Sequence, residues 1–157
     1  MGDPERIEIT TANRGDKADL LELIARQLDE HRLTPDRGRL AAAIDAILDD
    51  RGRGFFLIAR EGTRAVGVAY GARVWSLEHG GESIWLDELY VLPGMRGRGI
   101  GGRILDRFLD AASRAGFPAA DLEVDAEHAR AEGLYERNGF TRLARSRWVR
   151  PLERGIE

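Results

Sequence analysis

The segment LYVLPGMRGRGIGGRIL, residues 89–105, joins a strand pattern to a helix pattern through a run of glycines. It opens with apolar strand residues, breaks at Pro93, and resumes as an amphipathic helix at about residue 99. The glycines between the two patterns are Gly94, Gly97, Gly99, Gly101 and Gly102. The first N–H groups of a helix lack partners within it and lie at the positive end of its dipole. Glycines in front of them let an anion approach, so the segment predicts a phosphate-binding turn.

Two familiar phosphate motifs fit the turn poorly. A P-loop needs a Gly-Lys pair, which the chain lacks. Gly97, Gly99 and Gly102 do spell the G-x-G-x-x-G of dinucleotide-binding sheets, but that motif follows the first parallel strand of a doubly wound sheet. Here only one further strand-helix unit remains. The alternative interpretation is a tight strand-to-helix connection that binds nothing.

Composition limits the class of protein. The chain has 157 residues, 43% hydrophobic and 32% charged, which predicts one globular domain over residues 1–157. The net charge of -3 argues against a nucleic-acid partner. Cysteine is absent, which excludes disulfides and thiolate chemistry, and the three histidines lack metal-ligand spacing, so we expect no metal. With no long apolar run and no signal-peptide pattern, we expect no membrane contact and a cytoplasmic location.

Hydrophobic periodicity predicts a mixed α/β domain with the order β-α-α-β-β-β-α-β-α-β. The expected strands are 6–11, 55–59, 65–75, 84–92, 119–124 and 140–149. The expected helices follow Asp16 and Pro35 and cover about 99–115 and about 129–138. Turn residues separate the strands between 55 and 92, which indicates an antiparallel meander.

Two motifs at matching positions resemble the GNAT superfamily of acyl-CoA N-acyltransferases. The family pattern Arg/Gln-x-x-Gly-x-Gly/Ala falls on Arg96, Gly99 and Gly101. The segment HARAEGLYERNGF, residues 128–140, resembles the family's Asn-x-x-Ala-x-x-Leu-Tyr-x-x-x-Gly-Phe. It matches at Ala131, Leu134, Tyr135, Gly139 and Phe140, with His128 in place of the asparagine. The resemblance covers nearly the whole chain and implies a mostly antiparallel central sheet flanked by helices.

The resemblance also implies acetyl-CoA as co-substrate. Its pyrophosphate would bind the glycine turn. The residues expected to contact it through backbone amides or side chains are Arg96, Gly97, Arg98, Gly99, Ile100, Gly101 and Gly102. Charge-assisted hydrogen bonds would come from Arg96, Arg98 and Arg103. His128 occupies a further coenzyme-contacting position of the family. The pantetheine arm would lie along Leu89 and Val91, because the strand ending there and the strand 119–124 splay apart in this family and expose backbone groups to it.

Acetyl transfer to an amine poses two proton problems. An alkyl ammonium has a pKa of about 10.4, so a base must supply the neutral nucleophile at pH 7, and the departing thiolate needs a proton. By its match to the second motif, Tyr135 is the predicted general acid; the alternative is an ordinary packed aromatic. The acyl oxygen needs a fixed N–H donor, for which the Leu89 amide is the candidate.

Asp87 and Glu88 interrupt an otherwise apolar strand, where an acid is costly to bury without a purpose. Neighbouring strand residues point to opposite faces unless a bulge intervenes. Family members that acetylate spermidine and spermine look similar here. By that match Asp87 is the predicted base, directly or through water, and Glu88 a contact of the substrate ammonium. Glu30 and His31, between the first two helices, are further candidates for the acceptor wall, and the alternative is an ordinary solvated helix end.

The leading hypothesis is an N-acetyltransferase that moves the acetyl group of acetyl-CoA to a primary amine of a small cationic acceptor, by direct attack in a ternary complex. One alternative acetylates a protein N-terminus or a lysine. An alternative of another class is a coenzyme-binding sensor without turnover. The resemblance also implies a homodimer, by analogy with similar proteins.

Overall fold

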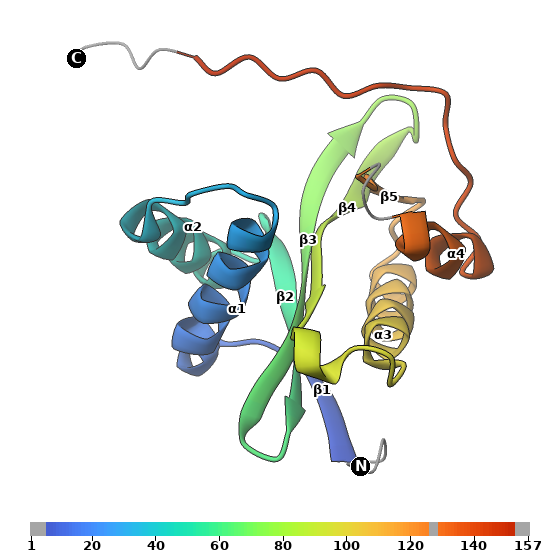
Figure 1. Cartoon of the computed structure of the whole chain (residues 1–157). Helices are drawn as coiled ribbons and strands as arrows, with labels where there is room; N and C mark the ends of the chain where they lie inside the picture. The colour runs from blue at the N-terminus through green and yellow to red at the C-terminus, as the bar shows by residue number, and fades with distance from the viewer. Residues whose placement is uncertain (1–5, 126–128, 153–157) are drawn as a thin grey trace. The chain divides into compact units, whose positions relative to one another are not determined.

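The computed structural model describes residues 6–125 and 129–152. The chain divides into two compact units, residues 1–123 and 124–157, and each is described here by itself. The first unit contains a five-stranded sheet in the order β1-β2-β3-β4-β5. Helices α1 and α2 pack on one face of this sheet and α3 packs on the other (Figure 1).

The strands are β1 (Ile7–Thr11), β2 (Gly54–Glu61), β3 (Arg64–Ser76), β4 (Gly81–Val91) and β5 (Ala120–Leu122). The helices are α1 (Lys17–Glu30), α2 (Arg37–Asp49) and α3 (Ile100–Arg114), with α4 (Ala129–Arg137) in the second unit. Strands β1 to β4 pair antiparallel, so the predicted meander is confirmed. Strand β5 joins β4 in parallel, which requires a crossover, and α3 supplies it.

The core lies on both faces of the sheet. Helix α1 buries Leu20, Leu23 and Ile24, while α3 buries Ile104 and Phe108, and all five side chains are at most 4% exposed. These residues repeat at the three- and four-residue spacing of an amphipathic helix. The apolar stripes therefore place the beginning of α3 against β3 and β4, next to the glycine turn.

Two glycines of β3 let α3 approach the sheet closely. A Cβ atom at Gly67 would lie 2.8 Å from Ile104 Cδ1, and one at Gly71 would lie 2.5 Å from Phe108 Cε2. Contacts this short would require the Ile104 and Phe108 side chains, or the helix itself, to shift. The absence of side chains at these two positions thus allows these two residues of α3 to lie directly against β3.

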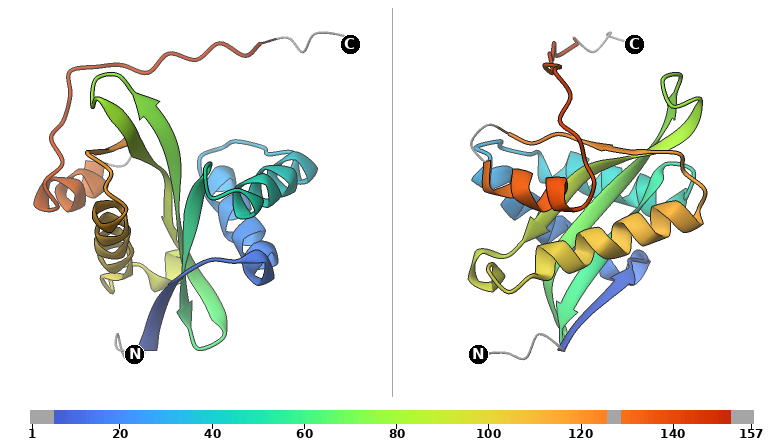
Figure 2. Two further views of the ribbon diagram at one scale, coloured as in Figure 1. Left: turned by 180° about the vertical axis from the view of Figure 1, so that it is seen from behind. Right: turned by 90° about the vertical axis from the view of Figure 1, so that its right-hand side faces the viewer.

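Strands β3 and β4 continue together beyond their neighbours. Strand β2 pairs with β3 only as far as Ala72, and β5 pairs with β4 only from Ile84 onward. Residues 73–83 therefore form a two-stranded arm at one end of the sheet, which is visible from behind in Figure 2. The tip of this arm exposes Trp75 and Leu77.

The expected sixth strand over residues 140–149 is not formed. This segment is exposed, and it carries no strand in the described part of the second unit. Its alternating pattern suits a strand, but a strand requires a neighbouring edge with which its backbone groups can pair. The prediction of this strand was wrong because alternation records side-chain pattern and not the presence of a partner.

Candidate active site

The glycine turn connects β4 to α3 through a 3-10 turn over Pro93–Met95. Gly97 has a φ of 80° and Gly99, the residue before α3, has a φ of 75°. Such left-handed values are strained for residues with a side chain. These two glycines are therefore required for the change of direction from strand to helix.

The turn exposes a row of amide donors. Arg103 N–H donates to the Gly99 carbonyl at 3.1 Å, which is the first backbone hydrogen bond of α3. Among the described residues, no backbone carbonyl accepts from the N–H groups ahead of it, which include those of Gly97, Gly99, Ile100, Gly101 and Gly102. Donors of this kind at the positive end of a helix favour an anion.

Gly101 differs from Gly97 and Gly99 because it does not have a left-handed φ. A Cβ atom there would meet only Val91 Cγ2, at an ordinary contact distance of 3.8 Å. The protein's own backbone and packing therefore tolerate a Cβ atom at this position. What glycine preserves at Gly101 is open space beside the amide row.

The arginines of the turn are held by the protein itself. Arg98 Nη2 lies 3.1 Å from Glu61 Oε1, and Arg103 Nη2 donates to the Ile7 carbonyl at 2.9 Å. Both contacts tie the turn to strands of the sheet. In this arrangement the backbone amides are the exposed donors, and the expected phosphate contacts of these two side chains stay a prediction.

Glu30, Tyr90 and Arg96 contact one another and form a brace between the end of α1 and the glycine turn. Arg96 Nε donates to the Val91 carbonyl at 2.9 Å and Arg96 Nη2 lies 2.8 Å from Glu30 Oε2. Tyr90 donates its hydroxyl to Glu30 Oε1 at 2.9 Å, and the Arg96 guanidinium carbon lies 5.4 Å from the Tyr90 ring centroid. Glu30 therefore faces the turn, and its predicted contact with an acceptor stays a prediction.

The contacts within the brace shift the pKa values of Tyr90 and Glu30. Burial, reinforced by the hydrogen bond to Glu30, raises the pKa of Tyr90 to about 12. Partial burial opposes ionisation of Glu30, but hydrogen bonds from Arg96 and Tyr90 outweigh it and lower the pKa of Glu30 below its usual value. At neutral pH the brace is an ionised carboxylate held by one guanidinium and one neutral phenol. His31 follows α1 directly, and its backbone N–H donates to the Gln27 carbonyl at 3.2 Å.

The two acids of β4 lie at a β-bulge. Tyr70 of β3 pairs with Glu88, but the next residue, Gly71, pairs with Leu86, so Asp87 is the extra residue on β4. A bulge redirects side chains and interrupts the alternation between faces. Asp87 is exposed and Glu88 is half-buried. The structure thus contains the irregularity that allows both acids to serve one site.

Tyr70 is a candidate active-site residue that was not predicted from the sequence. Its ring centroid lies 4.9 Å from that of Phe56, and its cross-strand partner is Glu88. Burial, with a further contribution from the Asp87 carboxylate, raises the pKa of Tyr70. The hydroxyl is therefore protonated at neutral pH beside the acid pair. The available signal was a single polar aromatic in the apolar run AVGVAYG.

Beyond the bulge, one edge of β4 is open. The Leu92 N–H donates to the Val66 carbonyl at 2.9 Å. Because antiparallel pairs alternate, Leu89 and Val91 direct their N–H and C=O groups away from β3. On that side β5 pairs only with residues 84–86, and within the described part of the chain no other strand continues along this edge. Strand β4 thus continues beyond the last residue of β5, and the predicted place of the pantetheine arm between two splayed strands stays a prediction.

The second motif lies in the second unit. The Tyr135 ring of α4 packs edge-on against Phe140, with centroids 5.8 Å apart, and burial raises the pKa of Tyr135. Gly139, just after the helix, has a φ of 86°, as expected for the residue that ends a helix. His128 lies outside the described residues, so its predicted coenzyme contact is untested.

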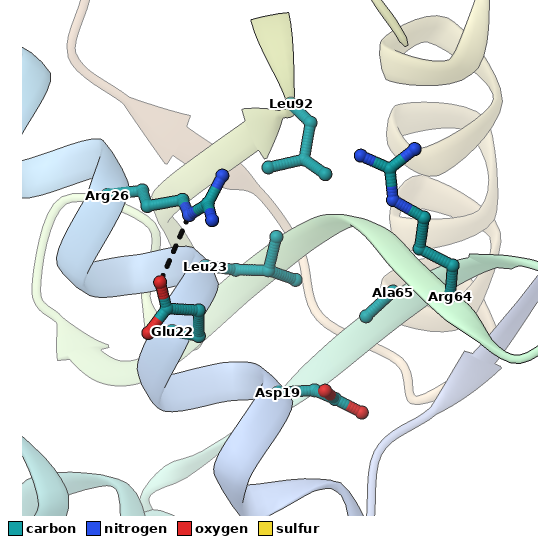
Figure 3. A pocket seen from close by; sticks show the side chains of 7 residues that line it. All are labelled: Asp19, Glu22, Leu23, Arg26, Arg64, Ala65 and Leu92. Carbon is teal, nitrogen blue, oxygen red and sulfur yellow. Dashed lines mark hydrogen bonds and ion pairs between the residues drawn. The ribbon is translucent and has the colours of Figure 1, made fainter. Parts of the chain in front are cut away.

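A separate shallow hollow of 130 Å³ lies between α1, the start of β3 and the end of β4 (Figure 3). It is lined by Asp19, Glu22, Leu23, Arg26, Arg64, Ala65 and Leu92. None of these is a site residue predicted from the sequence. Arg26 and Glu22 pair with each other across one turn of α1 at 3.1 Å, so the charged side chains of this hollow are partly neutralised.

Over residues 6–125 and 129–152, no three histidine, aspartate or glutamate side chains gather closely enough to hold a metal ion. In the same ranges no helix combines the length and the apolar character needed to cross a bilayer.

Comparison with known proteins identifies the class. The model of the acetyltransferase (GNAT) family matches residues 18–140, so this chain belongs to that family. A mycothiol acetyltransferase of Beutenbergia cavernae is 43% identical over 72 residues, which is 40% of this chain but only 24% of that protein. An uncharacterized N-acetyltransferase of Bacillus subtilis, YhfO, is 27% identical over 85% of this chain and 89% of its own length.

Solved structures share the fold. An integron cassette protein from the Cole Harbour salt marsh metagenome superposes with a TM-score of 0.82 at 26% identity, covering 99% of this chain and 95% of its own. An aminoglycoside N-acetyltransferase solved in complex with CoA gives a TM-score of 0.79 at 18% identity, covering 92% and 94%. At that identity the second likeness shows the fold alone. The resemblance to the polyamine-acetylating subgroup is not confirmed, since the named relatives are mycothiol acetyltransferases.

Proposed function

We propose that this chain transfers the acetyl group of acetyl-CoA to a primary amine of a small cationic acceptor, with both substrates bound at once. The observation that carries the proposal is the row of amides before Arg103, beside a Gly101 that the fold itself does not require. Membership of the acetyltransferase family supports the reaction class. The CoA complex of a protein with the same fold supports the coenzyme.

The coenzyme would occupy the turn and the open edge of β4. The amides from Gly97 to Gly102 would donate to the two phosphates. The outward N–H group of Val91 would donate to an amide carbonyl of the pantetheine arm, in the way that an added strand pairs with a free sheet edge, and Leu89 would lie beside the acyl end of the arm. The Arg96 guanidinium already binds the Val91 carbonyl, so its role there is to hold the turn in place.

The bulge would carry the proton chemistry. Asp87 would take the ammonium proton, directly or through water, and Glu88 would hold the cationic acceptor. The Leu89 N–H would donate to the acyl oxygen as that oxygen gains charge. Tyr135, which is protonated at neutral pH because burial raises its pKa, would supply a proton to the departing sulfur.

The acceptor class is supported by charge and by the named relatives. Two adjacent carboxylates at the bulge favour a cationic substrate. Several curated sequence relatives are named mycothiol acetyltransferases, after a small molecule, which supports a small acceptor. The match covers 24% of the Beutenbergia protein, so the particular acceptor is left to experiment.

Replacing Gly101 with valine tests the proposal. A side chain there fits the free protein but would occupy the space beside the amides. We expect calorimetry to show a loss of CoA affinity of more than about 100-fold, because two or more hydrogen bonds to a charged group are lost. Thermal stability should be preserved. Gly81→Val is the matched control, because Gly81 also lacks a left-handed φ and faces open space.

Unchanged CoA affinity in Gly101→Val would rule out binding of the coenzyme phosphates by the amide row. Release of free thiol from acetyl-CoA, measured with polyamines, aminoglycosides, amino acids and peptides as acceptors, tests the second substrate. Transfer to peptides alone would favour the protein acetyltransferase, and tight CoA binding with no transfer to any acceptor would favour a sensor.

A further inference from the structure

Gln27 of α1 has a buried oxygen without a partner. Its side chain is 6% exposed. The carboxamide Nε2 donates to the Leu89 carbonyl at 3.5 Å, while Oε1 has no hydrogen-bond partner among the described residues. Gln27 thus reaches the residue of β4 whose N–H is the proposed donor to the acyl oxygen.

A buried carbonyl oxygen without a donor costs stability, on the order of 1–3 kcal/mol. Native proteins pair nearly all such groups, and those left unpaired call for an explanation in terms of function or of a bound molecule. Leucine has a similar volume and could fill the same site without this cost. The presence of glutamine indicates that its oxygen is used in a liganded state of the protein.

The position of Gln27 Oε1 indicates that its ligand is the amine acceptor. The N–H and C=O groups of Leu89 leave β4 on the same side, toward the open edge. A ligand oxygen bound at the Leu89 N–H therefore lies beside the Leu89 carbonyl, to which Gln27 is bonded. Glu88 and Asp87 precede Leu89 on the same strand, so the group that meets these oxygens enters a region of negative charge. A protonated amine has both the N–H donors and the positive charge.

We propose that Gln27 Oε1 and the Leu89 carbonyl accept hydrogen bonds from the attacking amine of the acceptor and so aim its lone pair at the acyl carbon. This inference rests on the proposed function. In the transfer, the amine lone pair forms the C–N bond and the C–S bond breaks, with its electron pair leaving on sulfur. The ammonium gives one proton to the base before attack, and the nitrogen gives up a second proton as the amide forms. One of these two protons is released to solvent, and the other restores the acid that has protonated the departing sulfur. Gln27 exchanges no proton and acts as a binding and positioning residue.

The test is Gln27→Leu, which removes the oxygen and preserves the volume. We expect kcat/KM for 1,4-diaminobutane and for glucosamine to fall by about 10- to 100-fold, the effect of one lost hydrogen bond to a charged group. Affinity for acetyl-CoA by calorimetry and the slow hydrolysis of acetyl-CoA without amine should not change. The melting temperature should stay equal or rise, because a buried oxygen without a partner is removed.

Leu23→Met is the matched control for repacking of α1. Leu23 lies one turn earlier on the helix, is 3% exposed, and has no polar atom. A volume-conserving exchange of this kind costs less than about 1.5 kcal/mol. It should leave kcat/KM for both amines unchanged.

Three results would overturn the inference. A lower melting temperature with normal amine transfer would make Gln27 a structural residue whose oxygen is satisfied by water. A proportional loss of acetyl-CoA affinity would assign the oxygen to the coenzyme. If the wild-type protein binds acetyl-CoA but acetylates neither amine, the proposed role of Gln27 in binding the amine is wrong. Failure of the proposed function is seen separately, as wild-type protein that does not bind acetyl-CoA at all.

Discussion

At the scale of single residues, Asp87 changes what the acid pair can do. In a regular strand Asp87 and Glu88 would point to opposite faces, and one of them would be remote from any given site. The bulge makes Asp87 the extra residue opposite the Tyr70–Gly71 step. One carboxylate can then serve as the base while its neighbour binds the cation.

The two acids should separate kinetically. We expect Asp87→Asn to lower kcat for a primary amine by about 100-fold or more at pH 7, in the range for loss of a general base. The deficit should shrink as pH approaches about 10, because the amine then loses its proton without help. Glu88→Gln should instead raise the KM for the amine. Asp110→Asn on the exposed side of α3 is the control.

Steady-state kinetics between pH 6 and 10 measure both effects. If both variants match the wild type over this range, neither carboxylate has its assigned role. If the deficit of Asp87→Asn is the same at every pH, the residue acts through structure and not as a base.

At the scale of elements, the brace of Glu30, Tyr90 and Arg96 connects α1 to the turn before α3. Helix α1 ends at Glu30, and Arg96 lies between the 3-10 turn and Gly97, which has a left-handed φ. The contact joins two elements that are far apart in sequence. It fixes the start of the amide row relative to the helix that carries Gln27.

The brace predicts a loss of stability at alkaline pH. The pKa of Tyr90 is about 12 in the folded protein and about 10 when unfolded, so between these values the folded state retains a proton that the unfolded state has lost. The contribution of this group is therefore complete below pH 10 and falls as pH rises toward 12. Over this window we expect a decrease in the free energy of unfolding of at most about 3 kcal/mol from Tyr90.

Urea denaturation at pH 8, 10 and 11 measures this decrease, and Tyr90→Phe is the comparison. The variant lacks the phenol and should show a flatter dependence on pH than the wild type. Equal slopes in the two proteins would mean that the phenol does not hold its proton more tightly in the folded state.

At the scale of the whole molecule, the proposed chemistry needs both compact units. The amide row, the bulge and Gln27 belong to residues 1–123, whereas Tyr135 belongs to residues 124–157. If Tyr135 protonates the leaving sulfur, the second unit supplies the acid, and the first supplies the base and the groups that bind both substrates. The predicted homodimer belongs to the same scale, and sedimentation analysis tests it.

Tyr135→Phe separates these contributions. We expect kcat for the amine to fall by roughly 100-fold, as for the loss of an acid catalyst, while the affinity for CoA is preserved. Stopped-flow thiol release and calorimetry give the two quantities. Full turnover in Tyr135→Phe would leave the tyrosine as a packing residue beside Phe140.

Several features could be predicted from local sequence. The meander between residues 55 and 92 followed from strand runs separated by turn residues, and the glycine turn followed from spacing before an amphipathic helix. These features depend on neighbours within about ten residues, so a single chain carries enough information to indicate them. The last strand was mispredicted because its existence depends on a distant partner edge.

Local sequence was enough to predict the order of the elements before residue 140, the amide row at the start of α3, and an acid pair on an apolar strand. Folding alone shows that Asp87 is a bulge residue, that Arg96 binds Glu30, and that Gln27 of α1 reaches Leu89. Each of these depends on strand register or on a contact between elements far apart in the chain. Local periodicity does not encode such contacts, because they arise only when the sheet and its helices pack together.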